Sequence, residues 1–141
     1  MEKTLAPPVR KKTILVVDGD ELMRQLLTDI FTHHDLYNLL TAENGSDGLQ
    51  RSREFPGEID VLLTDLQLSG MSGMELAEAI AAERSAIKVL LISEIPRGWL
   101  LLNEGWHFLT KPFIASQLRT IVAGLVSPTR ESRFAASRAN Q

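Results

Sequence analysis

The stretch that decides the fold is I-D-V-L-L-T, Ile59 to Thr64. It is mostly apolar and lacks the alternation of apolar and polar residues that marks a half-exposed strand, so it predicts a strand buried on both faces of a parallel sheet. Asp65 follows directly. An aspartate at the end of a central strand is either an exposed strand terminator or a reactive carboxylate, and this stretch alone leaves both open.

Strand-like and helix-like segments alternate on both sides of this strand. We expect strands at 13–17, 37–41, 59–64, 88–92 and 108–109, and helices at 21–33, 46–54, 74–84 and 114–126. A poorly marked helix is expected at 93–105, where Pro96 and Gly98 interrupt the pattern. Five βα units in one small body predict the α/β class, with a doubly wound parallel sheet and helices on both faces.

The spacing of apolar residues predicts which side of each helix faces the sheet. In the first helix, Asp20 is placed to cap the N-terminus. The expected inward residues are Leu22, Leu26, Leu27, Ile30 and Phe31 in the first helix, Leu76 and Ile80 in the third, and Leu118, Ile121, Val122 and Leu125 in the last.

Length and composition suit one soluble domain. The chain has 141 residues and no cysteine, and no apolar run reaches the length of a signal peptide or a membrane helix. We therefore expect a cytoplasmic protein with no membrane association. The expected domain is 13–126, between a flexible lead at 1–12 and a flexible tail or linker stub at 127–141.

Charge is distributed unevenly. The net charge is −3, but both ends are basic, so residues 13–126 are more acidic than the whole. This acidic body does not suggest direct nucleic-acid binding, and it suits a cation site, a basic partner surface or simple solubility.

Polar residues stand at the carboxyl ends of the expected strands, where ligands bind in open α/β sheets. Asp18 and Asp20 follow the first strand, Asp65 the third, and Ser93 the fourth, while Lys111 follows the fifth. Neighbouring carboxylates favour a cation between them, and oxygen ligands alone favour Mg²⁺. A hydroxyl and an ammonium opposite them could hold phosphoryl oxygens.

Four motifs in order resemble the response-regulator receiver domain of two-component signalling. They are V-V-D-G-D at 16–20, L-L-T-D-L-Q-L-S-G-M-S-G at 62–73, L-L-I-S at 90–93 and F-L-T-K-P-F at 108–113. The resemblance covers about residues 13–126. It implies a flavodoxin-like (βα)5 sheet of order 2-1-3-4-5. It also implies a signalling domain, not an enzyme, that takes a phosphoryl group from a histidine kinase or a histidine phosphotransfer protein, with Mg²⁺.

The resemblance also implies roles for individual residues. Asp65 would be the phosphoacceptor, and the metal would bind Asp18, Asp65 and the backbone carbonyl of Gln67. Ser93 and Lys111 would bind the phosphate. Ser93 and Phe108 would form the switch that changes the surface for a downstream protein partner or a homodimer.

The sequence departs from the family pattern at Gly19, where a second acidic metal ligand is usual. We therefore expect weak Mg²⁺ affinity and poor phosphorylation, unless Asp20 partly substitutes as a ligand. Glu94 stands where a small residue is usual, beside the phosphate position. The segment between Ser93 and Lys111 is also about one helical turn short.

Three alternatives remain open at this point. Trp99 and Trp106 either pack in the core or form a partner surface. The whole domain could be a pseudo-receiver, an interaction module that no longer depends on phosphorylation. It could also be a haloacid-dehalogenase-like phosphatase with Asp18 as nucleophile and Asp20 as acid/base.

Overall fold

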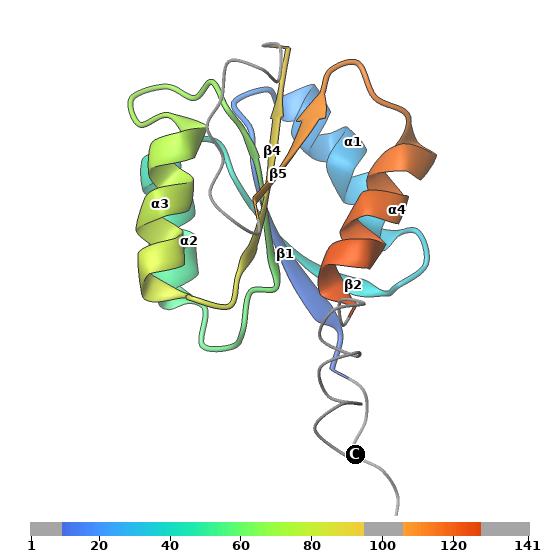
Figure 1. Cartoon of the computed structure of the whole chain (residues 1–141), viewed down its shortest axis with the longest axis horizontal. Coiled ribbons are helices and arrows are strands. Elements are labelled where there is room, and N and C mark those ends of the chain that lie inside the picture. Colours follow the sequence, from blue (N-terminus) through green and yellow to red (C-terminus); the bar gives the residue numbers. More distant parts are fainter. Residues whose placement is uncertain (1–9, 95–105, 128–141) are drawn as a thin grey trace, which may run out of the picture.

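The computed structural model describes residues 10–94 and 106–127, and these residues form a three-layer α/β body (Figure 1). Its five-stranded sheet is parallel throughout and has the order β2-β1-β3-β4-β5. The strands are β1 (Lys12–Val17), β2 (Tyr37–Ala42), β3 (Val61–Asp65), β4 (Lys88–Ser93) and β5 (Trp106–Thr110). The order confirms the flavodoxin-like fold, with β3 at the centre, although β3 begins at Val61, two residues later than the sequence predicts.

Four helices lie among the described residues: α1 (Glu21–Thr32), α2 (Gly45–Glu54), α3 (Gly73–Glu83) and α4 (Ala115–Val126). Figure 1 shows α1 and α4 on one face of the sheet and α2 and α3 on the other. The helix expected at 93–105 cannot be compared, because residues 95–105, with Pro96, Gly98 and Trp99, lie outside the described residues. Ser93 itself is the last residue of β4.

Side-chain caps begin three of these helices. The Asp20 carboxylate accepts a hydrogen bond from the Leu22 backbone N–H at 2.9 Å, as the sequence predicts. Asn44 caps α2 in the same way. Ser72 caps α3 as part of a capping box with Glu75. Each cap follows a strand end, so the loops at this edge of the sheet are held by side-chain hydrogen bonds.

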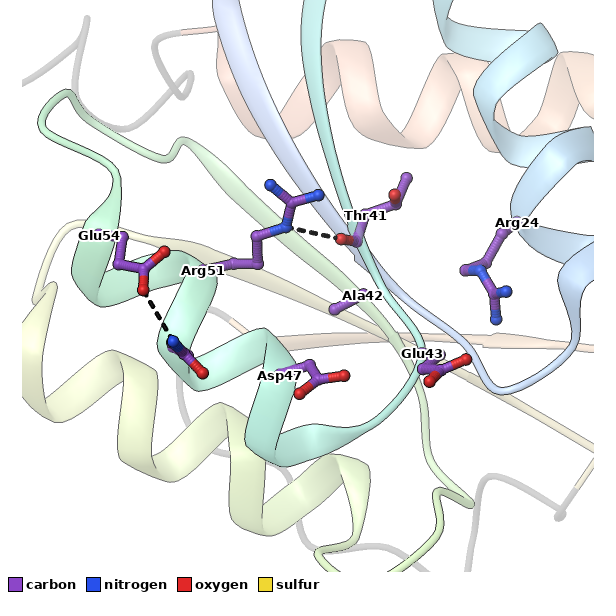
Figure 2. A pocket seen from close by; sticks show the side chains of 8 residues that line it. Arg24, Thr41, Ala42, Glu43, Asp47, Arg51 and Glu54 are labelled. Carbon is purple, nitrogen blue, oxygen red and sulfur yellow. Dashed lines mark hydrogen bonds between the residues drawn. The ribbon is translucent and has the colours of Figure 1, made fainter.

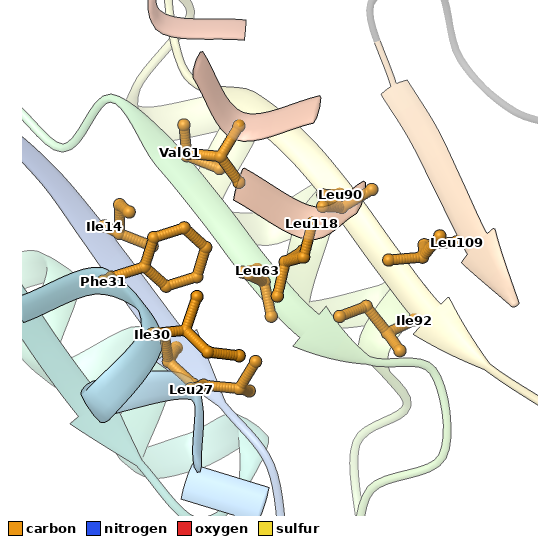
Figure 3. Close-up of a cluster of buried hydrophobic side chains, with 12 residues drawn as sticks. Ile14, Leu27, Ile30, Phe31, Val61, Leu63, Leu90, Ile92, Leu109 and Leu118 are labelled. Carbon is orange, nitrogen blue, oxygen red and sulfur yellow. The ribbon is translucent and has the colours of Figure 1, made fainter. Parts of the chain in front are cut away.

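The core consists of two apolar layers, one on each face of the sheet. Figure 3 shows the layer under α1 and α4, where side chains of β1, β3 and β4 meet those of the two helices. Val61, Leu62 and Leu63 of β3 are at most 1% exposed, as a strand covered on both faces requires. The sheet is therefore fixed at its centre, which places the carboxyl end of β3 in the middle of one edge.

The expected inward faces are largely confirmed, with one error in α1. Leu27, Ile30 and Phe31 are buried, but Leu22 is 74% exposed and Leu26 is 47% exposed. Leu22 and Leu26 are one helical turn apart and form a separate stripe, rotated away from the buried side. The apolar side of α1 is thus wider than the sheet can cover.

Trp106 is half-buried and packs against the apolar layer under α2 and α3. It lies in β5, which begins two residues earlier than the sequence predicts. Core packing is therefore confirmed for Trp106.

No helix among the described residues could cross a bilayer, because each is too short or too polar.

Arg84 joins α3 to the end of α2. Its guanidinium donates to the Ser52 hydroxyl at 2.9 Å and to three backbone carbonyls, those of Ser52, Phe55 and Gly57, at 2.7 to 2.9 Å. Hydrogen bonds from a charged donor are stronger than neutral ones, and losing them leaves the buried Ser52 without this partner.

We expect Arg84→Ala to lower the free energy of unfolding by about 2–4 kcal/mol, measured by urea denaturation. Arg53→Ala is the matched control, because Arg53 also joins the two helices but through an exposed ion pair with Glu83. That variant should lose much less stability than Arg84→Ala, because water and salt screen an exposed ion pair. Equal losses in both would contradict this account of Arg84.

Candidate functional site

Asp18 lies in the turn between β1 and α1 and is held on several sides. Its backbone N–H donates to the Ala42 carbonyl at 3.1 Å, and its carboxylate accepts the Asp20 N–H at 2.8 Å. Its own carbonyl accepts Nη1 of Arg24 at 2.7 Å. The side chain is therefore fixed at the carboxyl end of the sheet although the next residue is glycine.

The Asp18 side chain is almost fully buried, with the whole residue 3% exposed. Burial raises the pKa of its carboxyl above the ordinary value, and the nearby charges of Asp65 and Asp20 act in the same direction. The hydrogen bond from the Asp20 N–H and the charge of Lys111 lower the pKa and only partly offset this. A buried carboxylate under these conditions is stabilised by any added cation.

We expect Asp18→Asn to stabilise the fold near neutral pH. Because the folded-state pKa is raised, the native state binds more protons than the unfolded state between the two pKa values, and stability falls as pH rises through that window. Asparagine has no ionisable group, so the variant does not lose this stability as the pH rises. The gain should be present in urea denaturation at pH 7 and vanish below the ordinary aspartate pKa of about 4. A gain that is independent of pH would contradict this explanation.

Asp65 ends β3 and meets Lys111, which follows β5. Nζ of Lys111 lies 3.4 Å from Oδ2 of Asp65 and 3.8 Å from Oδ2 of Asp18. The other oxygen of Asp65 accepts the Gln67 backbone N–H at 3.1 Å. The structure therefore brings one amine between two carboxylates that are 47 positions apart in the sequence.

Ser93 and Lys111 are joined through the backbone. The Lys111 N–H donates to the Ser93 carbonyl at 2.9 Å, and the Lys111–Pro112 peptide bond is cis. Ser93 is buried and ends β4, next to β3 in the sheet. Phe108 is half-buried and packs on the layer under α2 and α3. The predicted polar residues thus lie at neighbouring strand ends, with Phe108 inside β5.

The donor set fits a magnesium ion held by few protein ligands. Asp18 and Asp65 offer carboxylate oxygens around a shared amine, and Mg²⁺ commonly binds one or two carboxylates and keeps several waters. Asp20 instead caps α1 with its side chain. Among residues 10–94 and 106–127, no three acidic, His or Cys side chains are grouped as a metal cluster. The fit is therefore to a sparse site, in line with the absence of a side chain at Gly19.

Two residues that hold the site are not apparent from the sequence. Arg24 reaches back from α1 to the Asp18 carbonyl and also lines a groove of about 440 Å³ beside the edge strand β2 (Figure 2). Across this groove, Arg51 donates from Nε to the Thr41 carbonyl at 3.0 Å. Gly73 is the other: its N–H donates to the Leu66 carbonyl at 2.8 Å, and a Cβ on it would overlap the Asp65 carbonyl.

Comparison with known proteins agrees with this geometry. Residues 14–123 match the family model described as "Response regulator receiver domain". A curated relative, the two-component response regulator-like protein PRR37 of Oryza sativa subsp. indica, is 29% identical over 121 residues. The match covers 80% of this chain but only 16% of the rice protein, so the chain spans about a sixth of that relative's length.

Solved structures show the same architecture. A receiver domain protein from Clostridium thermocellum has a TM-score of 0.73 and 25% identity, and the match covers 82% of this chain and 94% of that one. A chain in the complex of histidine kinase ThkA with response regulator protein TrrA has a TM-score of 0.68 and 28% identity, covering 82% of this chain and 99% of that chain.

Proposed function

This chain belongs to the response regulator receiver domain family of two-component signalling, and on that premise we propose that it accepts a phosphoryl group on Asp65. The observation that carries the proposal is the position of the Lys111 amine, between Asp65 and the buried Asp18. Lys111 is positioned to stabilise the negative charge of phosphoryl oxygens that arrive at Asp65.

The proposed step transfers a phosphoryl group from a phosphohistidine. One oxygen of Asp65 forms the new P–O bond while the P–N bond breaks. The imidazole leaves as a neutral ring when its other nitrogen carries a proton. Backbone hydrogen bonding from Gln67 to Asp65 orients the carboxylate for this attack.

Mg²⁺ would be held by Asp18, Asp65 and the Gln67 carbonyl, and it would supply charge stabilisation to the transferring phosphoryl group. The residues around the site then determine how tightly Mg²⁺ binds. Asp18 contributes a buried carboxylate, but Gly19 contributes no side chain. Asp20 is occupied as the cap of α1, so it substitutes poorly. We infer weak Mg²⁺ affinity.

A donor protein must cover the edge of the sheet that carries Asp65. Three exposed apolar side chains, those of Leu22, Leu26 and Ile114, lie on the helix starts beside this edge and are available to such a partner. The kinase–regulator complex among the similar structures is consistent with a histidine kinase as this partner. A histidine phosphotransfer protein would present the same chemistry.

The phosphorylated state would be read through Ser93 and Phe108. Once Ser93 bonds the phosphate, Phe108 moves and changes the surface near β5, which a downstream protein or a second copy could recognise. The added charge of about −1.5 to −2 is large enough to bias such a two-state element. We propose residues 13–126 as the cytoplasmic receiver unit that carries this switch, without enzyme turnover beyond its own phosphotransfer and dephosphorylation.

The proposal is tested by incubating the protein with acetyl phosphate and Mg²⁺ and weighing it intact, alongside Asp65→Asn. One phosphoryl adduct on the native chain and none on the variant supports it. No adduct at any Mg²⁺ concentration favours the second candidate, a pseudo-receiver, for which Gly19 is the specific observation. The phosphatase alternative explains less, because it gives Asp65 and Lys111 no role.

We expect Gly19→Asp to bind Mg²⁺ at least about tenfold more tightly, since one gained ligand worth about 1.4 kcal/mol is tenfold in affinity. The site has room, because a Cβ on Gly19 meets only the Glu43 carbonyl at an ordinary 3.7 Å. Isothermal titration with Mg²⁺ measures the change. Gly124→Asp, at an open position of α4, is the control and should leave the affinity unchanged. Equal affinity in Gly19→Asp and the native chain would refute the explanation.

A further inference from the structure

Glu94 lies at the mouth of the proposed phosphorylation site. It directly follows Ser93 and lines a cavity of about 500 Å³. The other lining residues are Met23 and Leu26 of α1, and Lys111, Pro112 and Phe113 of the loop before α4. Because Lys111 also contacts the Asp65 carboxylate, this cavity opens directly beside the proposed acceptor.

Of the two charged side chains that line this cavity, Lys111 has ion-pair partners and Glu94 has none among the described residues. The Lys111 amine is already shared by Asp65 and Asp18. The exposed carboxylate of Glu94 forms no hydrogen bond or ion pair with any of the residues that the structure describes. The remaining walls are largely apolar. An incoming donor therefore meets, beside Asp65, a negative charge that no residue in the described part of the chain pairs with.

We propose that Glu94 is a specificity-determining residue that selects phosphodonors by charge. It repels small dianionic donors and favours a donor that brings positive charge into the cavity, such as a protein with a lysine or arginine beside its phosphohistidine. This inference rests on the proposed phosphorylation of Asp65. Its basis is Coulomb repulsion inside a single cavity that Glu94 and Lys111 both line, where screening by water and salt is incomplete.

Two small phosphodonors transfer the same phosphoryl group but differ in charge. Acetyl phosphate is a dianion near neutral pH; its P–O bond to the acetyl group breaks, acetate leaves, and a P–O bond to Asp65 forms. Phosphoramidate carries a protonated nitrogen beside its phosphoryl group; its P–N bond breaks, ammonia leaves, and the same bond to Asp65 forms. Both steps are balanced without any further reactant.

The experiment measures the initial rate of adduct formation by intact mass for native protein and Glu94→Gln, with each donor. We expect Glu94→Gln to raise the rate with acetyl phosphate about three- to tenfold and the rate with phosphoramidate much less. The difference between donors should shrink at high salt, because screening weakens the repulsion. A purely structural role for Glu94 would change both rates by the same factor.

Two control variants test whether the charge at position 94 causes the effect. Glu94→Asp keeps the charge and should keep the native ratio of the two rates, and Glu78→Gln, on the exposed side of α3, should change neither rate. Adducts that form equally fast in the native chain and Glu94→Gln with both donors would overturn this inference alone. The absence of any adduct with either donor, in every variant, would overturn the proposed phosphorylation and this inference with it.

Discussion

Gly73→Ala should destabilise the protein by about 3 kcal/mol or more and displace the proposed acceptor. Overpacking a rigid site typically costs about 1–3 kcal/mol, and here the new methyl group meets backbone that cannot rotate away. It would overlap the Asp65 carbonyl and press on the backbone of Leu66. The chain must then move either the start of α3 or the end of β3, and both hold the site.

Urea denaturation measures this loss, and Gly124→Ala is the matched control. Gly124 also lies in a helix, but a Cβ there meets nothing within 4 Å. The control should gain about 0.5–1 kcal/mol, because alanine favours helix more than glycine does. If Gly73→Ala were as stable as the native chain, the close packing of α3 on the Asp65 backbone would be refuted.

Lys111→Met should slow phosphorylation of Asp65 by about 100-fold or more. Methionine keeps a long apolar chain but removes the ammonium that contacts both carboxylates. Loss of one preorganised donor to developing negative charge typically costs about 10²–10³ in rate. The repulsion between Asp18 and Asp65 also loses its only compensating cation among the described residues, apart from any bound metal.

The rate is measured by intact mass with acetyl phosphate at saturating Mg²⁺. Lys88→Met is the control, because it removes the same positive charge. Lys88 is the first residue of β4, so it lies at the amino end of the strand, away from Asp65. It should leave the rate within about twofold, because charges separated by more than a Debye length are largely screened. A Lys111→Met rate within threefold of native would show that the amine does not act on the phosphoryl group.

The sequence predicted, through local patterns, the strands and the polar residues at their carboxyl ends, and, through its resemblance to the receiver domain, the strand order that makes the ends carrying Asp18, Asp65 and Lys111 neighbours. It could not predict contacts that depend on how helices sit on the sheet. The exposure of Leu22 and Leu26 depends on how far the sheet extends under α1.

Contacts made through the backbone are equally hidden in the sequence. Arg24 holds the Asp18 carbonyl, and Gly73 lies against the Asp65 carbonyl. Neither residue type signals such a contact, since an arginine on a helix is usually solvated and a glycine in a loop is usually a turn residue. Both contacts depend on how α1 and α3 pack against the sheet.

The central claim, that Asp65 is the residue phosphorylated, is tested most directly by locating the modified side chain. Borohydride reduces an acyl phosphate to an alcohol, so it converts a phosphorylated aspartate to homoserine, which peptide mass mapping can locate. We predict homoserine at position 65 after treatment with acetyl phosphate, and none in a sample without the donor. Homoserine at position 18 or 20, with position 65 unchanged, would contradict the account.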